Sequence, residues 1–196
     1  GKYEKLVESS HQALVNVTKL LQPQPGTTLG EIGKTIQETI ESYGYKPVMN
    51  LSGHGIGPYE IHTAPSFPNY NNNNKQKITI GQTFAIEPFA SNGAGRIKEG
   101  QQPNIFEPVE RKPIRDSNAR AVFTEIMDKY KGLPFAKRWL VSQKWNEQRI
   151  DSALRILKAN GNIIAHAPLI EVADGIITQS EHSFLVEEDK VVCLTK

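Results

Sequence analysis

Three ionisable residues interrupt apolar, strand-like segments, and they limit what this chain can fold into. His54 lies between two glycines, Glu87 follows the apolar run 84–86, and Glu181 precedes the apolar run 184–186. A carboxylate in such a strand shifts its pKa toward the neutral form or needs a cation beside it. One imidazole and two carboxylates are a ligand set that divalent transition metals accept. The sequence therefore predicts metal-assisted chemistry, although three ligands are few for a two-metal site.

Length and composition are those of an ordinary globular protein. The 196 residues, 38% hydrophobic and 22% charged, can bury one good core and a small second module. No apolar run approaches the roughly 20 residues of a membrane span, and no secretory signal pattern opens the chain. Since the only cysteine, Cys193, has no internal disulfide partner, we expect a reducing compartment and a cytoplasmic protein.

Helical periodicity dominates the N-terminal part of the chain. The apolar residues of 3–22 recur at helical spacing until two prolines stop the segment. A second helix is expected over 29–43, because Thr28 and Glu31 have the spacing of a capping box and Gly44 can end the helix. Two amphipathic helices joined by a Pro/Gly turn need a sheet or further helices to pack on.

β-Strand patterns follow the two helices. We expect a strand over 46–51 and a hairpin over 77–87, where apolar residues alternate around a turn at Gly81. The chain closes with further expected strands, at 170–178, 182–187 and 190–194.

A helical pattern separates these two groups of strands. Apolar periodicity predicts three helices within 117–160, the first capped by Ser117, the second beginning at Pro134 and the third ending near Gly161. The expected division is therefore an α+β domain of residues 1–110 and 161–196 and a helical insert of residues 111–160.

The insert carries a local excess of positive charge. Between Arg111 and Lys158 there are twelve Lys and Arg against five Asp and Glu, whereas the net charge of the whole chain is only +2. A solvated helical face explains such an excess, and a surface that faces nucleic acid or the ribosome is the alternative. The sequence leaves both explanations open.

Five separated motifs resemble those of type II methionine aminopeptidases, in particular the archaeal ones. In the family's order, they are Asn50–Ile56 with Tyr59 and His62, Phe84–Ala90, Gly93–Gly95, Leu133–Leu140 and Gln179–His182. The similarity extends from near residue 3 to the C-terminus, and the long connection between the two glutamates is typical of type II enzymes. The resemblance implies the C-terminal half of a pita-bread (creatinase/aminopeptidase) fold, with the insert as a helical, winged-helix-like subdomain.

The resemblance also implies an activity and its site residues. The family removes the initiator methionine from nascent chains with two divalent metal ions, for which Co, Mn, Fe and Zn all suit a His/carboxylate set. Carried over by position, His54 and Glu87 would bind one metal and Glu181 would bridge both. Glu87 would also serve as general acid/base. His62 would hydrogen-bond the substrate near the scissile amide, and Ile61 would help to form the methionine pocket.

Two positions and one region depart from the family pattern. His166 stands where a tyrosine usually lines the methionine pocket, and Ser180 stands where an aromatic residue is usual. The family site also needs two aspartates, and every carboxylate before His54 falls on an expected helix. We therefore expect an N-terminal half, present as a separate chain, to complete the enzyme. Its substrates would be nascent peptides with N-terminal Met, with the ribosome as a further partner. The alternative is a non-catalytic pita-bread module that binds the ribosome or RNA through the basic insert.

Overall fold

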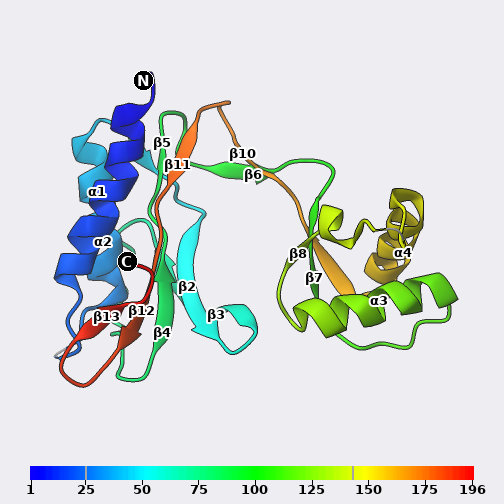
Figure 1. Cartoon of the computed structure of the whole chain (residues 1–196). Coiled ribbons are helices and arrows are strands. Elements are labelled where there is room, and N and C mark those ends of the chain that lie inside the picture. Colours follow the sequence, from blue (N-terminus) through cyan, green and yellow to red (C-terminus); the bar gives the residue numbers. More distant parts are fainter. Residues whose placement is uncertain (25, 143) are drawn as a thin grey trace. The chain divides into compact units, whose positions relative to one another are not determined.

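The structure, a computed structural model, describes residues 1–24, 26–142 and 144–196. The chain divides into unit 1, which contains Gly1–Lys98 and Ile170–Lys196, and unit 2, which contains Glu99–Leu169 (Figure 1). Unit 2 is thus longer than the helical insert expected over 111–160, because strands before and after its helices belong to the same unit. Among the described residues, no helix is long and apolar enough to cross a membrane.

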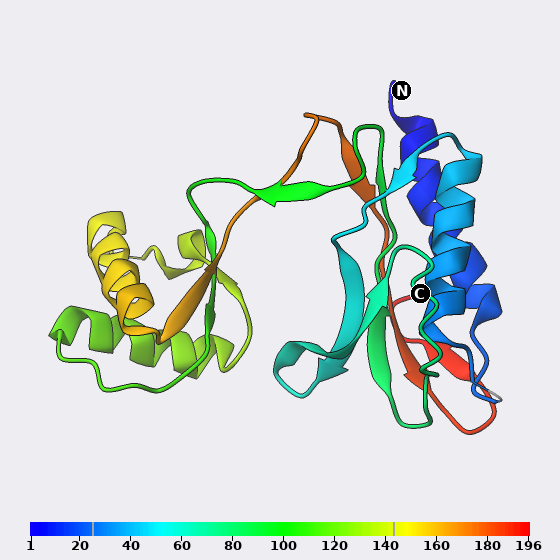
Figure 2. The same ribbon diagram turned by 180° about the vertical axis from the view of Figure 1, so that it is seen from behind.

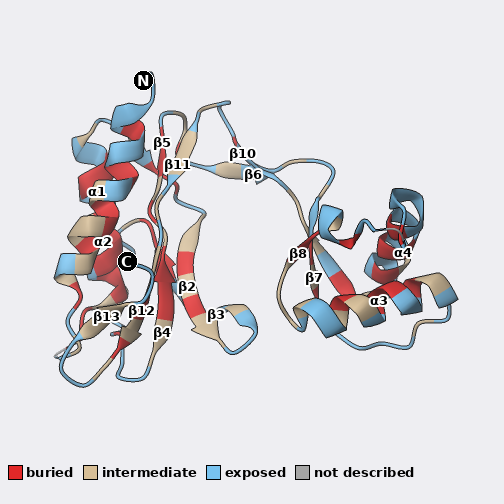
Figure 3. Ribbon diagram, viewed as in Figure 1, coloured by how far each residue is buried: buried red, intermediate tan, exposed pale blue. Residues whose placement is uncertain are grey.

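Two helices begin unit 1. α1 spans Glu4–Leu20 and α2 spans Leu29–Ser42, which confirms the two helices predicted from periodicity. The capping box is formed, because the Thr28 side chain accepts from the Glu31 N–H while the Glu31 carboxylate accepts from the Thr28 N–H at 2.8 Å. Both helices lie on the same side of the sheet in the two opposite views (Figures 1 and 2). Their inward stripes are buried (Figure 3), and these stripes include Leu6, Leu14, Val17, Ile32, Ile36 and Ile40.

An antiparallel sheet of five strands lies beneath these helices, in the order β13-β12-β4-β2-β3. Its strands are β2 (Ser52–Gly57), β3 (Glu60–Pro68), β4 (Thr83–Ile86), β12 (His182–Val186) and β13 (Val191–Cys193). A second sheet, in the order β1-β5-β11, joins β1 (Lys46–Pro47), β5 (Phe89–Ser91) and β11 (Ile177–Gln179). β6 (Ile97–Glu99) pairs with β10 (Leu169–Glu171).

Side chains of the central strand β4 point alternately to an apolar face of the sheet and to a polar one. Phe84 and Ile86 are fully buried in the core cluster that the helices share. Ala85, between them, points to the opposite face because side chains alternate along a strand. His54 on β2 and Ser183 on β12 both pair with Ala85, so their side chains share its face. The helices therefore cover one face, and His54 lies on the other.

The expected hairpin over 77–87 is wrong. Lys77 makes an isolated bridge with Thr28, and the Ile78 N–H donates to the Thr27 carbonyl, so this segment runs past the start of α2. β4 has β12 on one side and β2 on the other, so neither of its edges is available to the segment before Gly81. The strand expected over 46–51 is also shorter, because only β1 is extended and paired.

Unit 2 contains a sheet as well as helices. Three antiparallel strands in the order β8-β7-β9 are β7 (Ile105–Pro108), β8 (Phe135–Ala136) and β9 (Ile163–His166). The helices are α3 (Ser117–Tyr130) and α4 (Glu147–Asn160), with a 3-10 turn η1 (Lys137–Leu140) in place of the expected middle helix. Asp116 caps α3, not Ser117, and Gly161 ends α4 in the left-handed conformation as expected. Apolar side chains of both helices and of the sheet form one core.

Candidate metal site

Two neighbouring strand pairs are interrupted at the same level of unit 1. β4 ends at Ile86 and β5 begins at Phe89, while β11 ends at Gln179 and β12 begins at His182. Glu87 and Glu181 lie in this gap. Pro88 has no N–H to continue the ladder, and its carbonyl accepts from the Ser180 N–H at 3.3 Å. The interruption brings the two carboxylates to one place although 94 residues of sequence separate them.

His54 is placed by an unusually close approach of β2 to its neighbours. A Cβ atom on Gly53 would lie 2.2 Å from the carbonyl oxygen of Ala85 on β4. One on Gly55 would lie 2.5 Å from the carbonyl oxygen of Ala64 on β3. Only glycine fits at both positions, so the two glycines hold the His54 backbone tightly between β4 and β3.

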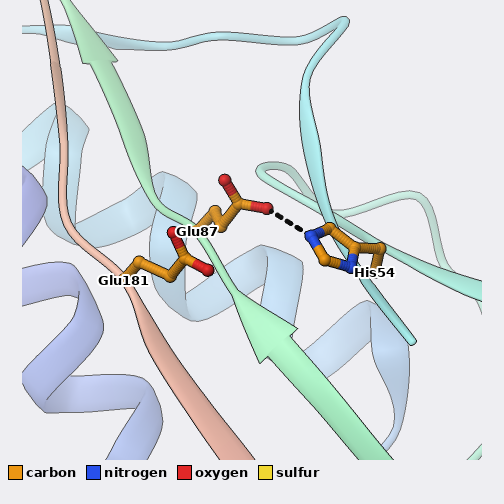
Figure 4. Close-up of side chains that lie close together, drawn as sticks. All are labelled: His54, Glu87 and Glu181. Carbon is orange, nitrogen blue, oxygen red and sulfur yellow. Dashed lines mark ion pairs between the residues drawn. The ribbon is translucent and has the colours of Figure 1, made fainter. Parts of the chain in front are cut away.

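The three predicted ligands converge. One ligand atom from each of His54, Glu87 and Glu181 can be chosen so that all lie within 4.8 Å of one another. Figure 4 shows Glu87 between the other two, with its Oε1 3.0 Å from His54 Nε2. The side chains of His54 and Glu87 are only 12% and 14% exposed. The sequence prediction that these three residues lie together is therefore met by the geometry.

The hydrogen bonding of His54 indicates that this cluster suits a cation. His54 Nδ1 lies 3.0 Å from the carbonyl oxygen of Gly55, and a carbonyl can only accept, so Nδ1 carries the hydrogen. In the neutral ring, Nε2 then presents a lone pair to the Glu87 carboxylate. Two acceptors at 3.0 Å need a proton or a cation between them. The residues present thus fit a divalent metal held by His54, Glu87 and Glu181.

The environment of Glu87 raises the pKa of its carboxyl. Burial raises the pKa of Glu87, and the nearby Glu181 carboxylate raises it further. The hydrogen bond from Gln179 and the interaction with the His54 imidazole lower the pKa of Glu87 without cancelling these effects. A carboxyl whose pKa is raised by burial and by a neighbouring carboxylate, and which lies beside a histidine, is the kind of group that serves in proton transfer.

The other predicted site residues differ in position. His62 on β3 lies edge-on against His54, with ring centroids 4.4 Å apart, and Ile61 beside it is half-buried. His166 ends β9 in unit 2, where its Nε2 lies 2.9 Å from Glu107 Oε2. Ser180 faces α1, since its hydroxyl lies 3.3 Å from that of Ser10. The proposed substrate contacts of His62, Ile61 and His166 stay predictions.

The sequence analysis missed Gln179 as a site residue. Its amide nitrogen lies 3.0 Å from Glu87 Oε2 and 3.0 Å from Glu181 Oε2. The available signal was its place two residues before Glu181, because residues two apart in an extended segment point to the same side.

Glu171 is a second residue that the sequence analysis missed. It is 3% exposed and accepts from four backbone N–H groups, at 2.5 to 3.1 Å. The donors belong to Ala94, Gly95, Ala173 and Gly175. Burial alone would raise the pKa of Glu171, but these four donors outweigh it and lower the pKa from 4.5 to about 2. The ionised carboxylate therefore ties the turn after β5 to the turn after β10.

Glu171→Gln is expected to lower the thermal stability of the protein at neutral pH. The amide can no longer accept from all four donors, and some of these buried N–H groups lose their partner. Because the folded-state pKa lies below the ordinary 4.5, the stabilisation by wild-type Glu171 is complete above about pH 4.5 and is lost toward pH 2. Melting temperatures measured from pH 7 to pH 2 should differ most between wild type and variant at pH 7 and converge in acid. Glu188→Gln, at an exposed position after β12, is the control, and a constant difference across the pH range would contradict this account.

Comparisons with known proteins identify the family of the chain. The profile of metallopeptidase family M24 matches residues 1–131. The methionine aminopeptidase of Methanocaldococcus jannaschii is 41% identical over 196 residues, which are all of this chain and 65% of the relative. That of Archaeoglobus fulgidus is 36% identical with the same coverage. The chain thus spans about two thirds of the length of these curated relatives.

Solved structures show the fold. A thermophilic Arx1 superposes with a TM-score of 0.81 at 13% identity, over 98% of this chain and 57% of that one. The methionine aminopeptidase of Thermotoga maritima gives 0.58 at 22% identity, over 98% of this chain and 51% of that one. Both are of the pita-bread type, which confirms the predicted pita-bread fold, while the winged-helix-like character of the insert stays a prediction. From the profile match, the identities with archaeal relatives and this fold, we conclude that the chain belongs to metallopeptidase family M24.

Proposed function

We propose that this chain is the C-terminal part of a metal-dependent methionyl aminopeptidase, which removes the N-terminal methionine of nascent proteins. The observation that carries the proposal is the convergence of His54, Glu87 and Glu181 on the side of the sheet opposite α1 and α2. Archaeal relatives that match the whole chain bear the name methionine aminopeptidase. A divalent cation would bind the imidazole and both carboxylates at once, whereas a single proton between His54 and Glu87 leaves the Glu181 carboxylate uncompensated.

In this proposal, His54, Glu87 and Glu181 hold the cation, and Glu87 also transfers a proton. A divalent ion in this cluster supplies a Lewis acid that polarises a peptide carbonyl and lowers the pKa of a water. Glu87 takes the proton of the attacking water at its carboxylate and returns it to the leaving amine. The bond from His54 Nδ1 to Gly55 keeps the ring in the tautomer that presents Nε2. His62, in contact with His54, contributes a hydrogen bond to the scissile amide.

The site needs ligands from outside this chain. His54, Glu87 and Glu181 are the one group of three or more candidate ligands that the described residues bring together. Two ions held by three side chains would leave most coordination positions to solvent. In our proposal, an N-terminal chain supplies two aspartates to complete a two-metal site. Co, Mn, Fe and Zn all suit this set of one imidazole and several carboxylates.

Reconstitution tests this proposal. We expect the chain alone, with Mn²⁺ or Co²⁺, to release no methionine from a Met-Ala-Ser peptide. We expect release when the chain is co-expressed with the part of the Methanocaldococcus jannaschii relative that precedes its matched region, because that part would supply the aspartates. Chelation should abolish the release, and metal addition should restore it.

Two results would count against the proposal. Release by the chain alone would show that no further chain is needed. A stable, metal-loaded complex without activity would exclude the peptidase assignment. The matched control carries His54→Ala in the same complex, and it should assemble without binding metal in full.

One feature of unit 2 supports a second candidate function, namely binding to RNA or the ribosome. Trp139 is 53% exposed, and the Arg138 guanidinium lies 5.9 Å from its ring centroid. An exposed aromatic ring beside cationic groups can stack on an unpaired base. This function would be favoured over the peptidase if affinity for ribosomes falls steeply with salt concentration and does not change when metal is removed.

A further inference from the structure

A single side-chain amide joins the two carboxylates of the site. Gln179 Nε2 lies 3.0 Å from Glu87 Oε2 and 3.0 Å from Glu181 Oε2. The amide nitrogen carries two hydrogens and no lone pair for accepting, so it can donate to both oxygens at once. It therefore offsets part of the repulsion between two carboxylates that belong to one cluster.

The backbone fixes Gln179 in this role. It is the last residue of β11, where it pairs with Phe89, the first residue of β5. The preceding residue, Thr178, turns to the other face and donates to the Leu6 carbonyl on α1 at 2.9 Å. Alternation along the strand then directs the Gln179 side chain toward the gap that contains Glu87.

The amide also selects which oxygen each carboxylate presents. Glu87 uses Oε2 for Gln179 and turns Oε1 toward His54 Nε2. Without the amide, the Glu87 carboxylate could rotate, and the two glutamates would separate in the absence of a cation. A ligand set that must first be gathered binds its ion more weakly than one already in place.

We infer that Gln179 is a positioning residue, which holds Glu87 and Glu181 side by side so that both are ready to receive a divalent cation. The inference rests on the proposed function only in taking the cluster to be a divalent metal site. Gln179 acts through the two glutamates and needs no contact with the substrate.

Metal affinity of the full chain is the first test. Titration calorimetry with Mn²⁺ or Co²⁺ should show that Gln179→Met, which keeps length but removes both donors, weakens binding about 10–100-fold, as loss of an outer partner of metal ligands does. Gln37→Met is the matched control, because the Gln37 amide donates to an exposed carboxylate, Glu41, at 2.8 Å on α2. The control should bind the metal as wild type does.

Carbon NMR of the metal-free chain is the second test, because it reports on carboxylates without activity. The carboxyl resonances of Glu87 and Glu181 should both shift in Gln179→Met and stay in place in Gln37→Met. Gln179→Asn, which keeps the amide on a shorter arm, serves as the second variant should Gln179→Met fold poorly by circular dichroism. It should shift the same resonances and weaken binding.

The outcomes separate this inference from the function on which it rests. If wild type binds the metal and Gln179→Met and Gln179→Asn bind it equally well with unshifted resonances, the role of Gln179 is refuted while the metal site stands. If wild type binds no divalent metal even when it is assembled with the N-terminal part of the relative, the proposed function fails, while carbon NMR of the metal-free chain still decides whether Gln179 holds the two carboxylates. If both carboxyl resonances shift and affinity falls, Gln179 positions the ligands.

Discussion

Replacing Glu87 by Gln should reduce methionine release by the assembled enzyme about 10²–10⁴-fold, the usual contribution of a general acid/base. Gln has the shape of Glu87 but cannot take up a proton, and it removes one negative charge from the cluster. The measurement is the initial rate of methionine release from Met-Ala-Ser at saturating metal, with bound metal determined on the same samples. Glu60→Gln, which alters an exposed carboxylate at the start of β3, is the matched control and should retain full activity.

The comparison of bound metal with rate decides what Glu87 does. If the variant keeps its metal and loses its rate, the loss lies in proton transfer. If metal and rate fall together and excess metal restores the rate, Glu87 is a ligand only. An unchanged rate would remove Glu87 from the mechanism altogether.

Gly53→Ala should damage both the fold and the metal site. The new Cβ atom would lie 2.2 Å from the carbonyl oxygen of Ala85, so β2 must move away from β4. Overpacking of this kind typically costs about 1–3 kcal/mol of the free energy of unfolding, occasionally more. Because His54 follows directly, the same movement draws its imidazole away from Glu87. Urea unfolding and metal titration should therefore both report a loss.

Gly57→Ala provides the control on the same strand. A Cβ atom there meets a side-chain methyl carbon of Thr63 at 3.3 Å, which a small shift can relieve. Its unfolding free energy and its metal affinity should stay near wild type. Equal losses in the two variants would mean that β2 is merely intolerant of substitution, and that the approach to Ala85 has no special role.

The helices could be predicted from sequence because their determinants are local. The capping box at Thr28 and Glu31 and the regular apolar stripe both fall within a few turns of chain. The hairpin over 77–87 failed because alternation describes one strand and does not identify its partner. β4 pairs with β12, which follows it by about a hundred residues, and no local signal before Gly81 reveals that this edge is taken.

The site shows the same limit. His54, Glu87 and Glu181 could be selected because an ionisable residue in an apolar strand is conspicuous. Gln179 was passed over because a neutral amide at a strand end costs little wherever it points. Glu171 was passed over because its donors at Ala94 and Gly95 precede it by 77 and 76 residues. Every residue except proline has a backbone N–H, so the sequence does not reveal which N–H groups donate to a buried carboxylate.

The four backbone hydrogen bonds that Glu171 accepts affect how the length of unit 2 can change. They fasten the turn after β5 to the turn after β10, and these turns lie a few residues before the chain leaves unit 1 after Lys98 and a few residues after it returns at Ile170. With both stems anchored inside unit 1, the intervening stretch behaves as a long closed loop, and doubling its length would add only about 0.6 kcal/mol of closure entropy. Unit 2 could therefore be enlarged, trimmed or exchanged over evolution while the cation ligands keep their geometry.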